Sequence, residues 1–255
     1  MKKISVLGTG WLGTPLVTSF VAEGYAVNSS TTTESKLLDI ETLGAEAFLV
    51  NIDEYEEFDM FLQAEILIIN ITSKNINAYQ GLLEKIQESS IEKLIFISST
   101  SVYPNTNAVV TEDNEVLKTP LSAIENLFRK SRYFETTIIR FGGLFGPERH
   151  PGNWFHGGRK ISQPEGFVNM IHQEDCINIL HEIIDQNIWG KTLNACSNNH
   201  PTRREFYTNA KLSMGFKVPE FEETDKPLFK IISSKKLKEV LGYEYIHDNL
   251  LEFTR

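Results

Sequence analysis

The chain has 255 residues, of which 34 are acidic and 25 basic, so its net charge is −9. This length suits one substantial core or a main domain with a smaller lobe, and the acidic balance argues against nucleic acid as a partner. Two cysteines are too few for a disulfide framework, and no uninterrupted apolar run reaches membrane-spanning length. We therefore expect a cytoplasmic protein, a monomer or homodimer, that acts on a small molecule and contacts neither nucleic acid nor a membrane.

The first predicted element is a short apolar strand at 4–7, which leads directly into the loop GTGWLG. In a GxGxxG loop between a strand and a helix, Gly8 allows a tight turn, Gly10 lets a pyrophosphate approach bare backbone, and Gly13 permits close helix packing. The helix predicted over 12–23 points its N-terminus at the anion. The alternative is an ordinary glycine turn. The predicted cofactor contacts of this loop are Gly8, Gly10, Trp11, Leu12 and Gly13.

Strand-like and helix-like segments alternate as far as residue 141, which predicts an α/β fold with a doubly wound parallel sheet, the Rossmann fold. Strands are predicted at 4–7, 25–31, 47–52, 66–71, 94–98 and 137–141, and helices at 12–23, 34–43, 75–89 and 121–130. The strands ILIINI and LIFIS are apolar on both faces, so we expect them at the centre of the sheet. The acidic run DEYEEFD at 53–59 is predicted to be a solvated connection.

Beyond residue 141 the pattern changes. Glycine, proline, histidine and arginine are frequent in 142–164, and this stretch is predicted to be a loop. Further strands are predicted at 167–171, 191–195 and 229–232, and further helices at 174–185, 201–214 and 234–241. We predict two domains, a dinucleotide-binding core at 1–141 and a small C-terminal substrate lobe at 142–255, some elements of which return to the core. The lobe is expected at the carboxyl ends of the strands, where open α/β sheets bind ligands.

Several motifs occur in the order typical of one family. They are GTGWLG at 8–13, FISSTSVYP at 96–104, IRFGGLFGPERHPG at 139–152, NMIHQED at 169–175 and LNACSNNHPTRREFY at 193–207. On these motifs the chain resembles an extended short-chain dehydrogenase/reductase of the NAD(P)-dependent epimerase/dehydratase group, in its atypical branch. The resemblance implies an NAD(P)-binding oxidoreductase or epimerase/dehydratase-like enzyme that acts on a small or nucleotide-linked carbonyl or alcohol substrate.

The same resemblance implies hydride exchange with a nicotinamide, supported by a hydroxyl on the fifth strand and a Tyr-x-x-x-Lys pair on the next helix. Ser99 stands at the position of the hydroxyl. No register of 117–127 contains the pair, and alignment on IENLF puts Leu117 and Leu121 at its two positions. A leucine side chain has no group that can accept or donate a proton, so Tyr103 is considered as a substitute for the missing tyrosine. The alternatives are a strand-end hydroxyl for Ser99 and a packing residue for Tyr103. The predicted catalytic residues are Ser99 and Tyr103.

The end of the second strand bears on the choice between NAD and NADP. Sites for NAD place an acid about 20 residues past the glycines to bind the ribose hydroxyls. Here the segment reads SSTTTESK, in which hydroxyls precede the first acid and a lysine follows it. This composition suits a 2′-phosphate, so NADP is favoured over NAD, although ordinary strand-end threonines are the alternative. The predicted contacts are Thr31, Thr32, Thr33 and Lys36, with Asn51, Ile52, Asn70, Ile71 and Thr72 at the ends of the third and fourth strands.

The predicted substrate contacts are Thr100, Arg140, Arg149 and His172. Arg149 has the geometry to bind a phosphate or carboxylate bidentately, and its alternative is a solvated loop arginine. The alternative for His172 is a structural histidine that precedes a helix. No spacing of histidine, cysteine or acidic residues indicates a metal. Two other functions stay open, a non-catalytic NAD(P)-binding sensor or scaffold and an α/β interaction module without a nucleotide.

Overall fold

The computed structural model describes residues 2–54, 59–155 and 157–252, so residues 55–58 of the acidic run lie outside the description. The chain divides into two compact units. The first unit holds the described residues of 1–98, 118–139 and 187–192, and the second holds those of 99–117, 140–186 and 193–255. The chain passes from one unit to the other several times, and the boundary after residue 141, with some elements of the lobe returning to the core, stays a prediction.

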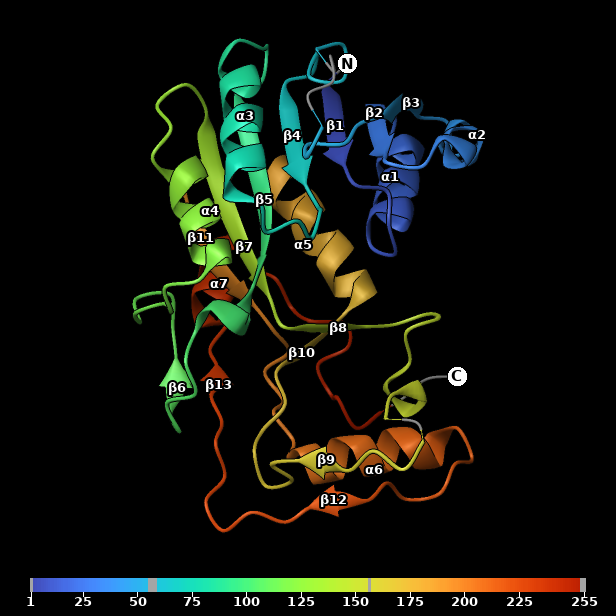
Figure 1. Ribbon diagram of the computed structural model, residues 1–255, viewed down its shortest axis with the longest axis vertical. Coiled ribbons are helices and arrows are strands. Elements are labelled where there is room, and N and C mark those ends of the chain that lie inside the picture. The colour runs from blue at the N-terminus through green and yellow to red at the C-terminus, as the bar shows by residue number, and fades with distance from the viewer. Residues whose placement is uncertain (1, 55–58, 156, 253–255) are drawn as a thin grey trace. The chain divides into compact units, whose positions relative to one another are not determined.

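Among the described residues, seven parallel strands form the main sheet (Figure 1). In spatial order they are β11 (Thr192–Ala195), β7 (Glu135–Phe141), β5 (Lys93–Ser99), β4 (Ile66–Ile69), β1 (Lys3–Leu7), β2 (Ala26–Thr31) and β3 (Glu46–Leu49). The chain order reverses between β1 and β4, so the doubly wound parallel sheet predicted from the sequence is confirmed. The apolar segments ILIINI and LIFIS contribute β4 and β5, which lie at the centre as predicted.

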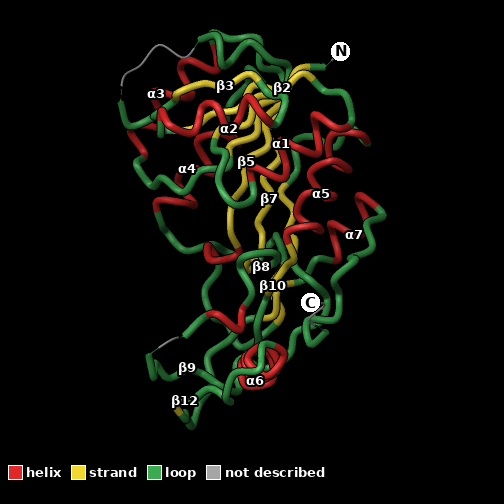
Figure 2. The backbone as a smooth tube through the Cα atoms, turned by 90° about the vertical axis from the view of Figure 1, so that its right-hand side faces the viewer, coloured by secondary structure: helices red, strands yellow, loops and turns green. Residues whose placement is uncertain are grey.

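Helices cover both faces of this sheet in the first unit. They are α1 (Gly13–Ala22), α2 (Leu37–Thr42), α3 (Ile76–Gln87) and α4 (Pro120–Arg129), with a 3-10 turn, η1 (Glu34–Lys36), before α2. Figure 2 shows α3 and α4 on one side of the strands and α1 on the other. The core under α3 and α4 is aromatic, because the rings of Phe96 and Phe128 stack with centroids 5.5 Å apart and Tyr79 meets both edge-on.

The second unit contains three α-helices and several very short strands among its described residues. The helices are α5 (Gln173–Asp185), α6 (Arg203–Ser213) and α7 (Lys235–Leu241), with 3-10 turns η2 (Thr100–Val102) and η3 (Pro151–Asn153). The short parallel pairs are β8 (Gly143–Phe145) with β10 (Met170–His172), β9 (Ile161–Ser162) with β12 (Phe221–Glu222), and β6 (Val109–Val110) with β13 (Ile231–Ile232). Within the described ranges, no helix combines the length and hydrophobicity of a membrane span.

The stretch 142–164 is mainly loop, as predicted, but it also contains the short elements β8, η3 and β9. The predicted strand at 167–171 begins later, as β10, and β6 and β12 were not predicted at all. These strands are two or three residues long and pair with segments far away in the chain. Local composition carries little signal for such pairs, because glycine and proline indicate turns wherever they occur.

Candidate functional site

The glycine-rich loop lies at the carboxyl end of β1, where the order of the strands reverses. Asn70, at the end of β4, donates through Nδ2 to the carbonyl oxygen of Gly8 at 3.1 Å. On the other side, the amide of Gly8 donates to Ser30 Oγ at 3.1 Å, and the amide of Thr9 donates to Ser30 O at 2.9 Å. The loop is therefore fixed to both neighbouring strands at the point where sheets of this topology bind ligands.

The three glycines of the loop have different surroundings. A Cβ on Gly13 would lie 2.1 Å from the carbonyl oxygen of Gly8, and a Cβ on Gly8 would lie 2.6 Å from Asn70 O. Gly8 also has a φ of +105°, which side chains rarely adopt. At Gly10, by contrast, no described atom beyond the adjacent residues Thr9 and Trp11 would lie within 4 Å of a Cβ. Gly8 and Gly13 are thus required by the loop itself, whereas Gly10 leaves open space above the backbone.

The helix after the loop begins without a side-chain cap. Leu12 is the N-cap of α1 and makes no side-chain hydrogen bond to the described backbone, whereas Asn75 caps α3 and Thr119 caps α4. Within the first turn, the amide of Thr14 donates to Gly10 O at 2.9 Å and Pro15 has no amide proton, so the attraction for an anion comes from the amides that precede Thr14 and from the partial positive charge of this helix end. Trp11 is half-buried and Leu12 is buried beside these amides. The arrangement fits the diphosphate of a dinucleotide.

The residues predicted to contact the adenosine end lie at the ends of β2 and β3. Thr31 is buried, and its hydroxyl accepts a hydrogen bond from the amide of Thr33 at 3.1 Å. The side chains of Thr32, Thr33 and Lys36 are exposed. After β3, Asn51 and Ile52 are both half-buried. After β4, where the other predicted cofactor contacts lie, Ile71 is half-buried and Thr72 is exposed. The hydroxyls and the lysine are thus accessible to a ligand, with the exception of Thr31.

Ser99 is the last residue of β5 and is half-buried. Its hydroxyl accepts a hydrogen bond from the amide of Ser101 at 3.1 Å, which begins the turn η2. This contact matches the structural alternative considered for Ser99. A serine hydroxyl that accepts one hydrogen bond still has its own proton to donate, so the contact is compatible with a role toward a substrate. Thr100, predicted as a substrate contact, is buried.

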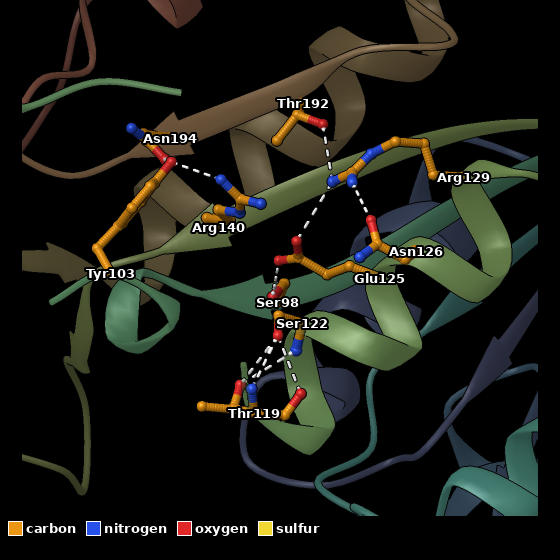
Figure 3. Close-up of polar contacts among 10 residues, drawn as sticks. All are labelled: Ser98, Tyr103, Thr119, Ser122, Glu125, Asn126, Arg129, Arg140, Thr192 and Asn194. Carbon is orange, nitrogen blue, oxygen red and sulfur yellow. Dashed lines mark hydrogen bonds and ion pairs between the residues drawn. The ribbon is translucent and has the colours of Figure 1, made fainter. Parts of the chain in front are cut away.

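Tyr103 and Arg140 contact each other inside the second unit (Figure 3). Arg140 Nη1 donates to Tyr103 Oη at 2.6 Å, and that hydroxyl donates to Asn194 Oδ1 at 2.9 Å. Both side chains are almost fully buried, and the guanidinium lies 4.9 Å from the ring centroid. Burial raises the pKa of Tyr103 and outweighs the opposing effect of Arg140. The phenol therefore keeps its proton at neutral pH, which makes it a poor base.

A second polar group, which the sequence did not indicate, lies in the first unit. The buried carboxylate of Glu125 in α4 accepts a hydrogen bond from Ser98 Oγ at 2.6 Å and pairs with Arg129 at 3.3 Å (Figure 3). The only local signal was the spacing of these two residues, an acid and a base four positions apart on a helix.

A cavity of about 710 Å³ lies wholly within the second unit. Its lining includes His172, Glu174, His247, Phe145 and Met214. His172 is the N-cap of α5, and its Nδ1 accepts a hydrogen bond from the amide of Glu174 at 3.2 Å. Arg149 is exposed, and its amide donates to Gly146 O at 3.0 Å.

The fold is a doubly wound parallel sheet with the glycine-rich loop at the point where the strand order reverses, as the sequence motifs led us to expect. No protein-family model matches the chain. The chain is 30% identical to protein YeeZ of Escherichia coli K12 over 269 residues, which cover 96% of each sequence. It therefore belongs to the family of protein YeeZ.

Solved structures share the fold over nearly the whole chain. A functionally unknown conserved protein from Silicibacter pomeroyi has a TM-score of 0.84 and 19% identity, with 98% of this chain and 96% of that chain covered. The dTDP-glucose 4,6-dehydratase of Bacillus anthracis, in complex with NAD, has a TM-score of 0.81 and 15% identity, with 98% and 94% covered. Further neighbours are UDP-sugar 4-epimerases and a short-chain dehydrogenase/reductase superfamily protein. The epimerase/dehydratase fold implied by the sequence is confirmed.

Proposed function

We propose that the chain binds NAD(P) at the glycine-rich loop and is an oxidoreductase or epimerase/dehydratase-like enzyme. Its substrate would be a small or nucleotide-linked carbonyl or alcohol compound. The observation that carries this proposal is the open space at Gly10, between two glycines that the loop itself requires. Several neighbours of the same fold are complexes with NAD, and some of these act on sugar nucleotides. When bound, the nicotinamide would supply a hydride donor or acceptor.

Different residues of the first unit would bind the diphosphate and the ribose phosphate of the cofactor. The backbone of the loop and the uncapped start of α1 would hold the diphosphate. The exposed side chains of Thr32, Thr33 and Lys36 would hold a ribose 2′-phosphate, which favours NADP over NAD. This preference leads to a direct test.

Replacement of Lys36 by glutamate is expected to weaken NADPH binding about tenfold and to leave NADH binding within about twofold. A carboxylate in place of the ammonium repels the 2′-phosphate, which only NADPH carries, and tenfold corresponds to about 1.4 kcal/mol. Calorimetric titration of both cofactors measures the two constants. Lys130→Glu, an exposed charge reversal elsewhere in the first unit, serves as the control. An equal loss for NADPH and NADH would remove Lys36 from the cofactor site.

Substitution of Ser99 by alanine is expected to lower turnover about 100-fold, because a donor to the substrate oxygen is lost. Oxidation of NADPH is followed with a panel of aldehydes, ketones and keto-sugars. Ser101→Ala is the matched control, since Ser101 contributes only its backbone amide to the contact with Ser99. Turnover that is unchanged in Ser99→Ala would exclude the assigned role. Cofactor binding without turnover of any compound would favour the sensor or scaffold.

A further inference from the structure

Three titratable side chains meet at the cavity of the second unit. The imidazole rings of His172 and His247 lie with centroids 3.7 Å apart and an interplanar angle of 37°. His247 Nε2 lies 2.8 Å from Glu174 Oε2. All three residues line the cavity, and Phe145 meets the ring of His172 edge-on at 5.2 Å. Two segments far apart in the chain therefore place a histidine–carboxylate pair and a second imidazole in one accessible hollow.

A buried carboxylate fixes this arrangement. Asp175, in the first turn of α5, accepts hydrogen bonds from the hydroxyl of Tyr243 and the amide of Ile246, both at 2.7 Å. It also accepts a hydrogen bond from the amide of His247 at 3.1 Å. The segment that carries His247 is thereby attached to the turn that carries Glu174. Asp175 is a positioning residue for the pair.

The geometry of the rings argues against a metal ion at this cluster, although the three side chains offer suitable ligand atoms. Two imidazoles bound to one ion at about 2.1 Å in a tetrahedral site hold their ring centres roughly 5 Å apart. The observed separation is 3.7 Å with the rings tilted by 37°, which is closer than two ligands of one ion allow. The Nδ1 atom of His172 also accepts a backbone hydrogen bond, so in the neutral ring the proton lies on Nε2, the other possible metal-binding atom.

The two histidines consequently have different roles available to them. Burial and the neighbouring His247 lower the pKa of His172 to about 4, against the opposite effects of Asp175 and Glu174. His172 is then a neutral ring that offers an Nε2–H donor at neutral pH. In His247, the Nε2–H donates to the carboxylate of Glu174, which leaves the lone pair of a neutral ring on Nδ1. A base oriented by a carboxylate thus lies beside a neutral hydrogen-bond donor.

We propose that His247, oriented by Glu174, is a general base for a small hydroxy-carbonyl compound bound in this cavity, and that His172 donates a hydrogen bond to its carbonyl oxygen. The Nδ1 atom of His247 takes the proton from the carbon next to the carbonyl. The electron pair of the broken C–H bond forms a C=C bond, and the carbonyl oxygen takes up the negative charge opposite the Nε2–H of His172. Return of the proton restores the ketone, so no oxidant or reductant is consumed. This inference rests on the proposed function for the carbonyl class of the substrate and is independent of the cofactor.

The first test is ¹⁵N NMR of the imidazoles in the full chain, with His172→Asn and His247→Asn used to assign the signals. We expect His172 to remain a neutral Nε2–H tautomer down to about pH 5, and Glu174→Gln to reduce the share of the Nε2–H tautomer in the neutral ring of His247. Glu148→Gln, another acid that lines the cavity, is the matched control. Titration of His172 between pH 6 and 8, or an unchanged His247 in Glu174→Gln, would overturn the proposal.

The second test measures the chemistry without cofactor. Dihydroxyacetone is incubated with the protein in D₂O, and the loss of its carbon-bound protons is followed by NMR. We expect exchange above the protein-free rate, about 100-fold slower in His247→Asn and unchanged in Asp225→Asn, a substitution of an exposed residue of the same unit outside the cavity lining. The absence of exchange by the native protein, or equal exchange by His247→Asn, would overturn the acid–base role. An NADPH titration of the same sample separates that result from a failure of the cofactor assignment.

Discussion

Replacement of Gly10 by valine is expected to abolish detectable NAD(P) binding while the melting temperature stays within a few degrees of the native value. The added side chain enters the open space that we assign to the diphosphate, and it meets no described atom beyond the adjacent residues Thr9 and Trp11 within 4 Å at its Cβ. We expect affinity to fall at least 100-fold, which is about 2.7 kcal/mol. Calorimetric titration with NADPH and NADH, together with a thermal melt, measures both quantities.

Two alanine substitutions, one at Gly10 itself and one at Gly13, provide the controls for that experiment. Gly10→Ala adds a single methyl group and is expected to weaken binding less than Gly10→Val. Gly13→Ala places a Cβ 2.1 Å from the carbonyl oxygen of Gly8, so it is expected to reduce stability as well as binding. If Gly10→Val retained native affinity, the diphosphate would not lie against this backbone and the proposed function would lose its main support.

Substitution of Asp175 by alanine is expected to destabilise the protein by at least about 3 kcal/mol. The fully buried carboxylate accepts hydrogen bonds from the amides of Ile246 and His247 and from the hydroxyl of Tyr243. Each donor that stays buried without a partner costs about 1–3 kcal/mol. For a chain of this size the melting temperature should fall by about 6–12 °C. Denaturant and thermal unfolding followed by circular dichroism measure the change.

The control for this substitution is Asp225→Ala, an exposed aspartate in the same unit, which is expected to change stability by less than about 0.5 kcal/mol. Because the chain divides into two compact units, near-UV and far-UV signals are compared to test whether unfolding is a single transition. A loss below about 1 kcal/mol in Asp175→Ala would show that the segment carrying His247 is held mainly by other contacts.

The sheet was predictable from the sequence because its signal is local. The central strands are continuous apolar runs, and GTGWLG specifies both a turn and the start of a helix. The short strands β8, β9 and β12 carry no such signal, since each depends on a partner distant in the chain. The short elements within the predicted loop at 142–164 were missed for this reason. Regular structure of two or three residues is decided by tertiary contacts and not by composition.

In the site, too, the residues with a local sequence pattern could be predicted and those that meet only through tertiary contacts could not. Gly8, Gly10 and Gly13 could be assigned separate roles from their spacing, and each now has a distinct environment. The pair formed by Glu174 and His247 had no signature, because 73 positions separate its members. Tyr103 was considered for catalysis from its motif, but motif position says nothing of burial, and the structure shows its hydroxyl in contact with buried partners.

The interleaved course of the chain limits how the protein can be dissected. Residues 187–192 belong to the first unit, where the amide of Ile138 donates to Lys191 O at 2.8 Å and the hydroxyl of Thr137 donates to Ile188 O at 3.0 Å. A truncated gene that stopped after residue 141 would lack these acceptors, so the amide of Ile138 and the hydroxyl of Thr137 in β7 would lose their hydrogen-bond partners. An excised nucleotide-binding fragment would therefore need this short segment grafted back, through a linker or a permuted order of the coding sequence.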